Sequence, residues 1–306
     1  MRVATIDIGT NTVLLLIAES RADGTLAPVA ERATITRLGE GVDQRRTLAP
    51  AAIERTNACL SSYAEVIRAA GVEKIGVVGT SAMRDAQGGS AVRDHVAAVL
   101  GVEARVISGD EEARLTFAGA VSGLALPPGD LAVFDIGGGS TEIVQGRLGA
   151  QGKVEHVSFA RSFDLGSVRL TERHLKNDPP TGDELDALRR AVEGELAELS
   201  LRDLPVIGIA GTMTTLAAVS LEMATYDSAR VHGHMMLRRE IDRVVRDLAA
   251  KPLHERRLVP GLEPKRADVV IAGGVLASAV LERLSAERVR ISDRGVRWGL
   301  AESLVQ

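Results

Sequence analysis

The chain has 306 residues, of which 45% are hydrophobic and 25% charged, a composition typical of a soluble globular protein of about two domains. A formal net charge of −4 excludes a global basic field that would recruit nucleic acid or a membrane, and an aromatic content of 2% argues against a base-stacking surface. Because Cys59 is the only cysteine, a disulfide framework is excluded and a reducing cytoplasm is the expected location.

The chain begins with a predicted β-hairpin. Residues 3–8 and 12–20 are apolar stretches of strand length, and the segment that joins them reads "DIGTNT" from Asp7 to Thr12. No secretory leader is expected, because the first strand follows Arg2 at once.

Strands and helices then alternate as far as residue 123, which indicates an α/β architecture. The most distinct helix is expected from Pro50 to Ala70, because Ile53, Leu60, Ala64 and Ile67 share one face. The other expected elements are one or two strands in 25–39, a strand then a loop in 74–85, a helix in 90–101, a strand in 103–109 and a helix opened by three acids in 110–123.

A second series of elements starts after residues 124–130, where paired prolines mark a candidate linker. Thr181 and Glu184 form a predicted capping box, followed by an apolar stripe that ends at Leu199. The run from Val269 to Leu281 is too short to span about 30 Å of hydrocarbon, so we expect a buried helix there. The remaining expected elements are a hairpin in 131–148, a strand, glycine turn and helix in 204–220, a helix in 237–250, a strand in 288–292 and a helix in 295–305.

The second hairpin repeats the pattern of the first, with Asp135 standing 128 positions after Asp7. A single repeat of this length indicates duplicated domains and not a solenoid of short units. We therefore expect two domains, residues 1–125 and 126–294.

The two loops have the chemistry of phosphate-binding turns. Glycine lets backbone N–H groups approach a ligand closely, and successive N–H groups form an anion-binding nest. The acids would repel a bare phosphate, so they indicate a hard cation such as Mg²⁺, which binds carboxylates and phosphate oxygens together. The candidate hydroxyl and amide donors are Thr10, Asn11, Thr12, Ser140 and Thr141, and the candidate metal ligands are Asp7, Asp135 and Glu142.

A third glycine turn supports this hypothesis, because Gly211 and Thr212 follow an apolar strand and open a helix, a ready phosphate site. One glycine-rich turn is more often only a turn. Two matching loops and this third turn together favour a phosphate-binding cleft.

Other site classes are excluded or disfavoured by their motifs. The chain lacks a G-x-x-x-x-G-K-[ST] loop, and Glu142 stands where the last glycine of G-x-G-x-x-G would be. Nucleophile elbows and H-E-x-x-H are also missing. His232 and His234 could form half of a metal site, but with no cysteine nearby a transition-metal role is disfavoured.

Taken together, these segments resemble the exopolyphosphatase / guanosine pentaphosphate phosphohydrolase (Ppx/GppA) family, within the actin, sugar kinase and heat-shock chaperone superfamily. The pair "ISGDEEA" and "DIGGGSTE" is the most specific part of the resemblance. The segments that carry it are residues 6–12, 79–86, 107–113, 134–144, 208–218 and 292–299.

The resemblance implies two ribonuclease-H-like (actin-like ATPase) domains with an interdomain cleft, a final helix in 295–306 that returns to the first domain, and a homodimer. It implies that Glu112 is the catalytic carboxylate and Arg84 a phosphate ligand; by the residues alone, Asp110 and Glu111 would serve as well as Glu112. It assigns Asp135 and Glu142 to Mg²⁺. It places these residues along the two phosphate loops: Asp7, Gly9, Asn11 and Thr12 in the first, and Gly137, Gly138, Gly139, Ser140 and Thr141 in the second.

The activity implied is Mg²⁺-dependent removal of the terminal phosphate of inorganic polyphosphate, with Glu112 orienting and deprotonating the attacking water. Hydrolysis of guanosine pentaphosphate is the alternative, and a small-molecule phosphotransferase or a non-catalytic sensor are more distant ones. Many family members carry a further C-terminal helical domain beyond the point where this sequence stops, at Gln306, so we expect short polyphosphate chains as substrates. Trp298 stands where the family usually has Glu.

Overall fold

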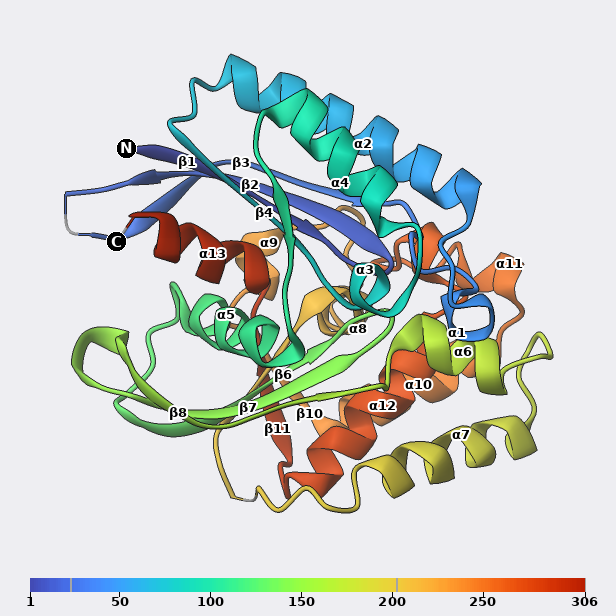
Figure 1. The fold of residues 1–306 in the computed structure, drawn as a ribbon. Coiled ribbons are helices and arrows are strands. Elements are labelled where there is room, and N and C mark those ends of the chain that lie inside the picture. Colours follow the sequence, from blue (N-terminus) through green and yellow to red (C-terminus); the bar gives the residue numbers. More distant parts are fainter. Residues whose placement is uncertain (23, 202, 306) are drawn as a thin grey trace. The chain divides into compact units, whose positions relative to one another are not determined.

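The computed structural model describes residues 1–22, 24–201 and 203–305 (Figure 1). The chain divides into two compact units, of which unit 1 comprises Met1–Gly119 with Val296–Gln306 and unit 2 comprises Ala120–Gly295. Each unit is built around one mixed β-sheet.

The sheet of unit 1 has the strand order β3-β2-β1-β4-β5. β1 pairs antiparallel with β2, and β2 with β3, whereas β4 lies parallel to both β1 and β5. The predicted first hairpin is therefore confirmed. Its strands are β1 (Arg2–Ile8), β2 (Thr12–Ser20), β3 (Leu26–Ile35), β4 (Lys74–Gly79) and β5 (Ala104–Val106).

Helices cover both faces of this sheet (Figure 1). α2 (Pro50–Ala69) and α4 (Gly89–Leu100) pack on one face, and α13 (Val296–Val305) packs on the other against β1, β2 and β4. The helices expected from the apolar periodicity at 50–70 and 90–101 are thus confirmed. The remaining helices are α1 (Val42–Arg45), α3 (Ser81–Asp85) and α5 (Gly109–Val121), which crosses the division between the units.

The sheet of unit 2 has the order β10-β11-β9-β6-β7-β8. The order β8-β7-β6-β9-β11 repeats that of unit 1, with the same antiparallel and parallel pairs, and β10 is added at the edge. This shared order confirms the predicted α/β class of two ribonuclease-H-like domains. The strands are β6 (Gly129–Ile136), β7 (Thr141–Leu148), β8 (Val154–Phe163), β9 (Val206–Ile209), β10 (Met235–Leu237) and β11 (Arg288–Ile291).

The core of unit 2 is organised around α12 (Val270–Arg283), which is buried from Val270 to Leu281. This confirms the expected buried helix, and none of the helices in the described part of the chain has the length and apolarity needed to cross a bilayer. The other helices are α6 (Ser167–His174), α7 (Gly182–Glu195), α8 (Ala210–Ser220), α9 (Ser228–Val231), α10 (Arg238–Ala249), α11 (Leu253–Arg256) and the 3₁₀ turns η1 (Ala150–Gly152) and η2 (Pro264–Arg266).

Three local expectations need correction. The loop expected after β4 is the short helix α3, whose first turn is closed by N–H groups that donate to Thr80 O. The capping box of α7 is confirmed, but the helix ends at Glu195; Leu196 and Leu199 are buried in a turn that continues the same spacing beyond it. β8 and α6 were not predicted, although alternating larger side chains at 157, 159, 161 and 163 are a strand signal.

Trp298 fills the contact between α13 and the sheet of unit 1. It is 1% exposed and belongs to an apolar cluster with Val3, Leu16, Ala18 and Ala301. A large aromatic side chain in such a place contributes through the apolar area that it buries.

We expect Trp298→Ala to lower the free energy of unfolding of unit 1 by about 3–5 kcal/mol, because truncation of a buried aromatic residue leaves a cavity. Urea unfolding followed by circular dichroism measures the loss. Val29→Ala is the control, since Val29 is exposed on β3 and its change should stay within about 0.5 kcal/mol. A loss below about 1 kcal/mol would contradict this packing role.

The capping box of α7 generates a pH-dependent prediction. Backbone N–H groups of Thr181, Lys176 and Asn177, together with the Asn177 amide, donate to the Glu184 carboxylate and lower its pKa from 4.5 to about 2. Because the folded-state pKa lies below the unfolded value, the stabilisation is fully present above about pH 4.5 and is lost as the pH falls towards 2.

Glu184→Gln should therefore lower the midpoint of thermal unfolding at pH 7, and the difference from wild type should shrink between pH 4.5 and pH 2. Glu195→Gln, at the other end of the same helix, serves as the control. A difference that is constant across this pH range would exclude the ionised carboxylate as the stabilising group.

Candidate functional site

The two Asp-Ile-Gly loops have the same geometry. In unit 1, Gly9 N–H donates to Thr12 O at 3.1 Å, and in unit 2, Gly137 N–H donates to Ser140 O at 3.0 Å. Both loops are four-residue turns that link the central strand of a sheet to its antiparallel neighbour. The repeat in the sequence therefore corresponds to one structurally equivalent loop in each unit.

The carbonyl groups of the first loop are held by the segment that follows β3. Gly39 N–H donates to Thr10 O at 2.8 Å, and the N–H groups of Thr36 and Arg37 donate to Asn11 O at 3.1 and 3.0 Å. Because C=O and N–H of one peptide group point in opposite directions, the next N–H groups along the loop face away from this segment.

Asn11 carries the clearest sign of a ligand site in unit 1. The residue is 7% exposed, and within the described structure both its amide nitrogen and its amide oxygen are buried without a hydrogen-bond partner. Buried polar groups are normally paired, so an amide left in this state is suited to bind a ligand.

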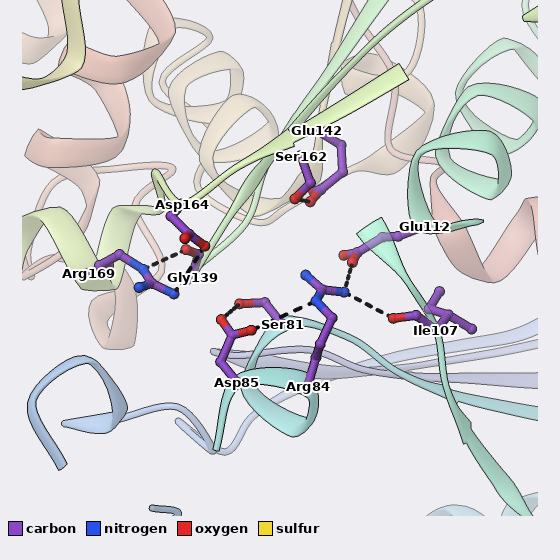
Figure 2. A network of polar contacts seen from close by, with 10 residues as sticks. All are labelled: Ser81, Arg84, Asp85, Ile107, Glu112, Gly139, Glu142, Ser162, Asp164 and Arg169. Carbon is purple, nitrogen blue, oxygen red and sulfur yellow. Dashed lines mark hydrogen bonds and ion pairs between the residues drawn. The ribbon is translucent and has the colours of Figure 1, made fainter. Parts of the chain in front are cut away.

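Arg84 and Glu112 meet in unit 1 although they lie on different helices (Figure 2). Arg84, on α3 after β4, places Nη1 at 3.0 Å from Glu112 Oε2 and at 3.0 Å from Ile107 O. Its Nε lies 3.8 Å from Asp85 Oδ1, and Ser81 Oγ donates to Asp85 Oδ2 at 3.2 Å. The two residues that the resemblance assigns to catalysis thus form one ion pair.

The structure separates the three acids at the start of α5, which the sequence alone leaves equivalent. Glu112 is 6% exposed and faces Arg84, whereas Asp110 is exposed. Glu111 pairs at 2.9 Å with Arg105, a partly exposed contact on β5. Only Glu112 combines burial with a cationic partner that is itself a candidate phosphate ligand.

The second loop is held by the start of α6. Ser167 N–H donates to Gly137 O at 2.9 Å, and the N–H groups of Val168 and Arg169 donate to Gly138 O at 2.9 and 3.1 Å. Arg169 Nε donates to Gly139 O at 2.8 Å. With these carbonyls turned to α6, the N–H groups of Gly138, Gly139 and Ser140 face the other way, as in an anion-binding nest.

Two of the predicted metal ligands are neighbours in unit 2. Asp135 on β6 and Glu142 on β7 are directly paired across the hairpin, so their side chains lie on one face. Glu142 is buried, and Ser162 Oγ donates to its Oε1 at 2.6 Å (Figure 2). Asp7 occupies the corresponding position of β1 in unit 1, where its cross-strand partner is Leu14.

This carboxylate pair fits a hard divalent cation by its chemistry, since Mg²⁺ is often bound through one or two carboxylates together with waters and phosphate oxygens. Among the described residues, no three or more His, Cys, Asp and Glu side chains gather as a potential metal site. His232, considered above as half of such a site, places Nδ1 at 3.0 Å from Asp293 Oδ1 and 3.3 Å from Ser292 Oγ.

The third turn differs from a simple glycine-rich loop. The left-handed conformation is adopted by Ala210, with φ 66°, and α8 starts at this residue. A Cβ at Gly211 would overlap the guanidinium of Arg266, so the lack of a side chain at Gly211 leaves room for this guanidinium. Thr212 Oγ1 donates to Ile136 O at 3.4 Å, which ties the start of α8 to the end of β6.

Sequence reasoning missed the residues that support the loops: Arg169, Gly166, Arg266 and the segment 36–39. Their signals were glycines at 39 and 166 shortly after a strand, but a glycine in such a place is also an ordinary turn. A Cβ at Gly166 would lie 2.3 Å from Gly138 O, and one at Gly39 would lie 2.2 Å from Thr10 Cγ2. Gly166 is required by the backbone of the second loop and Gly39 by the Thr10 side chain of the first. Neither contact can be predicted from the local sequence around the glycine.

The family model described as the Ppx/GppA phosphatase family matches residues 16–306. Exopolyphosphatase 2 of Mycobacterium tuberculosis is 39% identical over 322 aligned residues, which cover 99% of this chain and 98% of that protein. The crystal structure of an exopolyphosphatase-like protein aligns with a TM-score of 0.93 and 34% identity over 99% of this chain and 97% of that one.

A more distant relative is named for the guanosine substrate. Guanosine-5'-triphosphate,3'-diphosphate pyrophosphatase of Vibrio atlanticus is 29% identical over 307 aligned residues, which cover 99% of this chain and 59% of that protein.

The close contact at Gly166 makes a testable prediction. We expect Gly166→Ala to lower the free energy of unfolding of unit 2 by about 1–3 kcal/mol, because the new Cβ would displace the Gly138 carbonyl. Chemical denaturation followed by circular dichroism measures it. Gly194→Ala is the matched control, since a Cβ there meets no atom within 4 Å and should stabilise by about 0.4–1 kcal/mol. Equal effects of the two substitutions would contradict the proposed contact.

Proposed function

Since the chain belongs to the Ppx/GppA phosphatase family, we propose that it is an exopolyphosphatase that hydrolyses the terminal phosphoanhydride bond of inorganic polyphosphate. The observation that carries the proposal is the ion pair of the buried Glu112 with the partly buried Arg84, in a unit whose first loop presents an unpaired Asn11 amide. The name of the relative that is 39% identical over nearly the whole chain supports polyphosphate as the substrate.

In this proposal Glu112 orients the attacking water and accepts its proton. General-base assistance of this kind contributes typically about 10²–10⁴-fold to the rate. The ion pair with Arg84 suits the role, because it fixes the carboxylate in one orientation beside a guanidinium, a group that binds phosphate through parallel N–H donors.

The loop N–H groups act on the phosphate oxygens. Phosphoryl transfer requires in-line placement of the nucleophile and stabilisation of charge on the transferred group, which preorganised donors provide. Gly9 to Thr12 and Gly137 to Thr141 are the donor segments, and the start of α8 at Gly211 and Thr212 is a third.

Asp135 and Glu142 are the proposed ligands of Mg²⁺, with Asp7 of unit 1 as a further oxygen ligand. When bound, the cation would neutralise charge on the phosphate oxygens. The paired positions of Asp135 and Glu142 on one hairpin support this assignment. Cytoplasmic location and a homodimeric state are further parts of the proposal; the first rests on the single cysteine and the second on the family resemblance.

Hydrolysis of guanosine pentaphosphate is the second candidate, favoured by the name of the Vibrio atlanticus relative. The same residues would serve both reactions, because both cleave a terminal phosphoanhydride bond. Membership of a phosphatase family favours hydrolysis over transfer to an acceptor hydroxyl or a sensor without turnover.

The decisive experiment measures phosphate release from short polyphosphate, long polyphosphate and guanosine pentaphosphate in parallel, with Mg²⁺ and with a chelator. Release from polyphosphate that is abolished by chelation supports the proposal. Release from the guanosine substrate alone would establish the second candidate, and no release from any of them would refute both.

Glu112→Gln should reduce kcat on polyphosphate by at least about 10²-fold with little change in KM, because the amide keeps the shape of the side chain but cannot accept the proton. Steady-state phosphate release measures both constants. Glu111→Gln, one residue away in the same helix and paired with Arg105, is the matched control. A kcat within tenfold of wild type for Glu112→Gln would remove Glu112 from the role of base.

A further inference from the structure

The carbonyls of the second phosphate loop are not all held in the same way. Backbone N–H groups of α6 hold the carbonyls of Gly137 and Gly138. The carbonyl of Gly139 instead accepts from a side chain, Arg169 Nε, at 2.8 Å (Figure 2).

This contact sets the direction of one particular N–H group. Gly139 O and Ser140 N–H belong to the same peptide group and point in opposite directions. Gly139 has no Cβ, so rotation of this peptide meets little steric resistance from the residue itself. The hydrogen bond from Arg169 therefore selects the orientation in which Ser140 N–H points away from α6, with those of Gly138 and Gly139.

Arg169 is itself held firmly. The residue is 5% exposed, and its own N–H donates to Gly138 O at 3.1 Å. Its Nη2 lies 3.8 Å from Oδ1 of Asp164, a side chain that is 80% exposed at the end of β8. The planar guanidinium has donors of fixed direction, so its Nε–H bond to Gly139 O makes it a suitable clamp.

We propose that Arg169 is a positioning residue of the second phosphate loop, which keeps Ser140 N–H directed at a phosphate oxygen of the bound chain. The inference rests on the proposed function. Burial of an arginine carries a desolvation cost that a neutral donor would reduce. The positive charge beside a loop that binds an anion raises the affinity of the loop for phosphate, which gives a reason for an arginine here in spite of its desolvation cost.

The first test is kinetic. Arg169→Met keeps the length of the side chain and removes its donors, and it should lower kcat/KM on polyphosphate by about 10–10³-fold, up to the loss found when one preorganised donor is removed. Arg169→Lys retains the charge without the Nε–H and should fall between Met and wild type. Arg173→Met, on the exposed side of the same helix, is the matched control and should stay within about twofold of wild type.

The second test observes the loop directly and does not depend on turnover. Amide hydrogen exchange of residues 137–141 is measured with and without methylenediphosphonate, an unreactive analogue of the phosphoanhydride. We expect the ligand to slow exchange in the wild type and Arg173→Met, and to have little effect in Arg169→Met, while exchange in α12 stays the same in all three.

Equal protection in Arg169→Met and wild type, or kcat/KM within threefold, would overturn the inference, as would a wild-type loop that the ligand does not protect. If Arg169→Met unfolds, Arg169→Lys replaces it in the exchange experiment, since it keeps the charge and removes the Nε–H donor to Gly139 O. A fall in protection by that variant would support the inference, and unchanged protection would overturn it. If the ligand protects the wild-type loop and Arg169→Met loses that protection, while the wild type does not hydrolyse polyphosphate, the proposed function alone would be refuted.

Discussion

The carbonyl groups of the two glycine loops are the groups on which the candidate site depends. In each unit they are bonded to a neighbouring segment, which is 36–39 in unit 1 and the start of α6 in unit 2. Since a peptide group cannot point both its oxygen and its N–H the same way, these bonds turn N–H groups outward. A short, flexible sequence thereby acquires a fixed set of donors, and donors that need no rearrangement are the ones that stabilise a charged transition state well.

The two units repeat one architecture but have different chemistry. Their hairpins match residue for residue, yet Asp7 is paired across the strands with Leu14, whereas Asp135 is paired with Glu142. Only unit 2 therefore presents a pair of carboxylates on the hairpin, while unit 1 has the Arg84–Glu112 ion pair, in which Glu112 is buried. The proposed division of work, with cation binding in unit 2 and water activation in unit 1, follows from this difference within a duplicated fold.

Much of the fold could be predicted from the sequence because the signals are local. The period of apolar residues predicts α2 and α12, the spacing of Thr181 and Glu184 predicts the start of α7, and the repeated Asp-Ile-Gly loops predict both hairpins. The end of α7 was predicted less well, because the apolar spacing continues into a turn where the helix has already stopped. The apolar pattern indicates which residues are buried. It does not distinguish a helix from a turn, because both can place apolar residues at this spacing in the core.

The amino-acid sequence alone specifies the duplicated α/β design, the two Asp-Ile-Gly loops and the set of acids from which the candidate site is drawn. It did not determine which acid is buried against a cation, because Asp110, Glu111 and Glu112 occupy the same kind of position in one helical turn. The tertiary structure decided this by bringing Arg84, 28 residues away in the chain, to Glu112. It also decided the role of Arg169, which holds a carbonyl 30 residues away. Both contacts depend on how strands and helices pack within a unit, and no spacing within a short segment encodes such a distance.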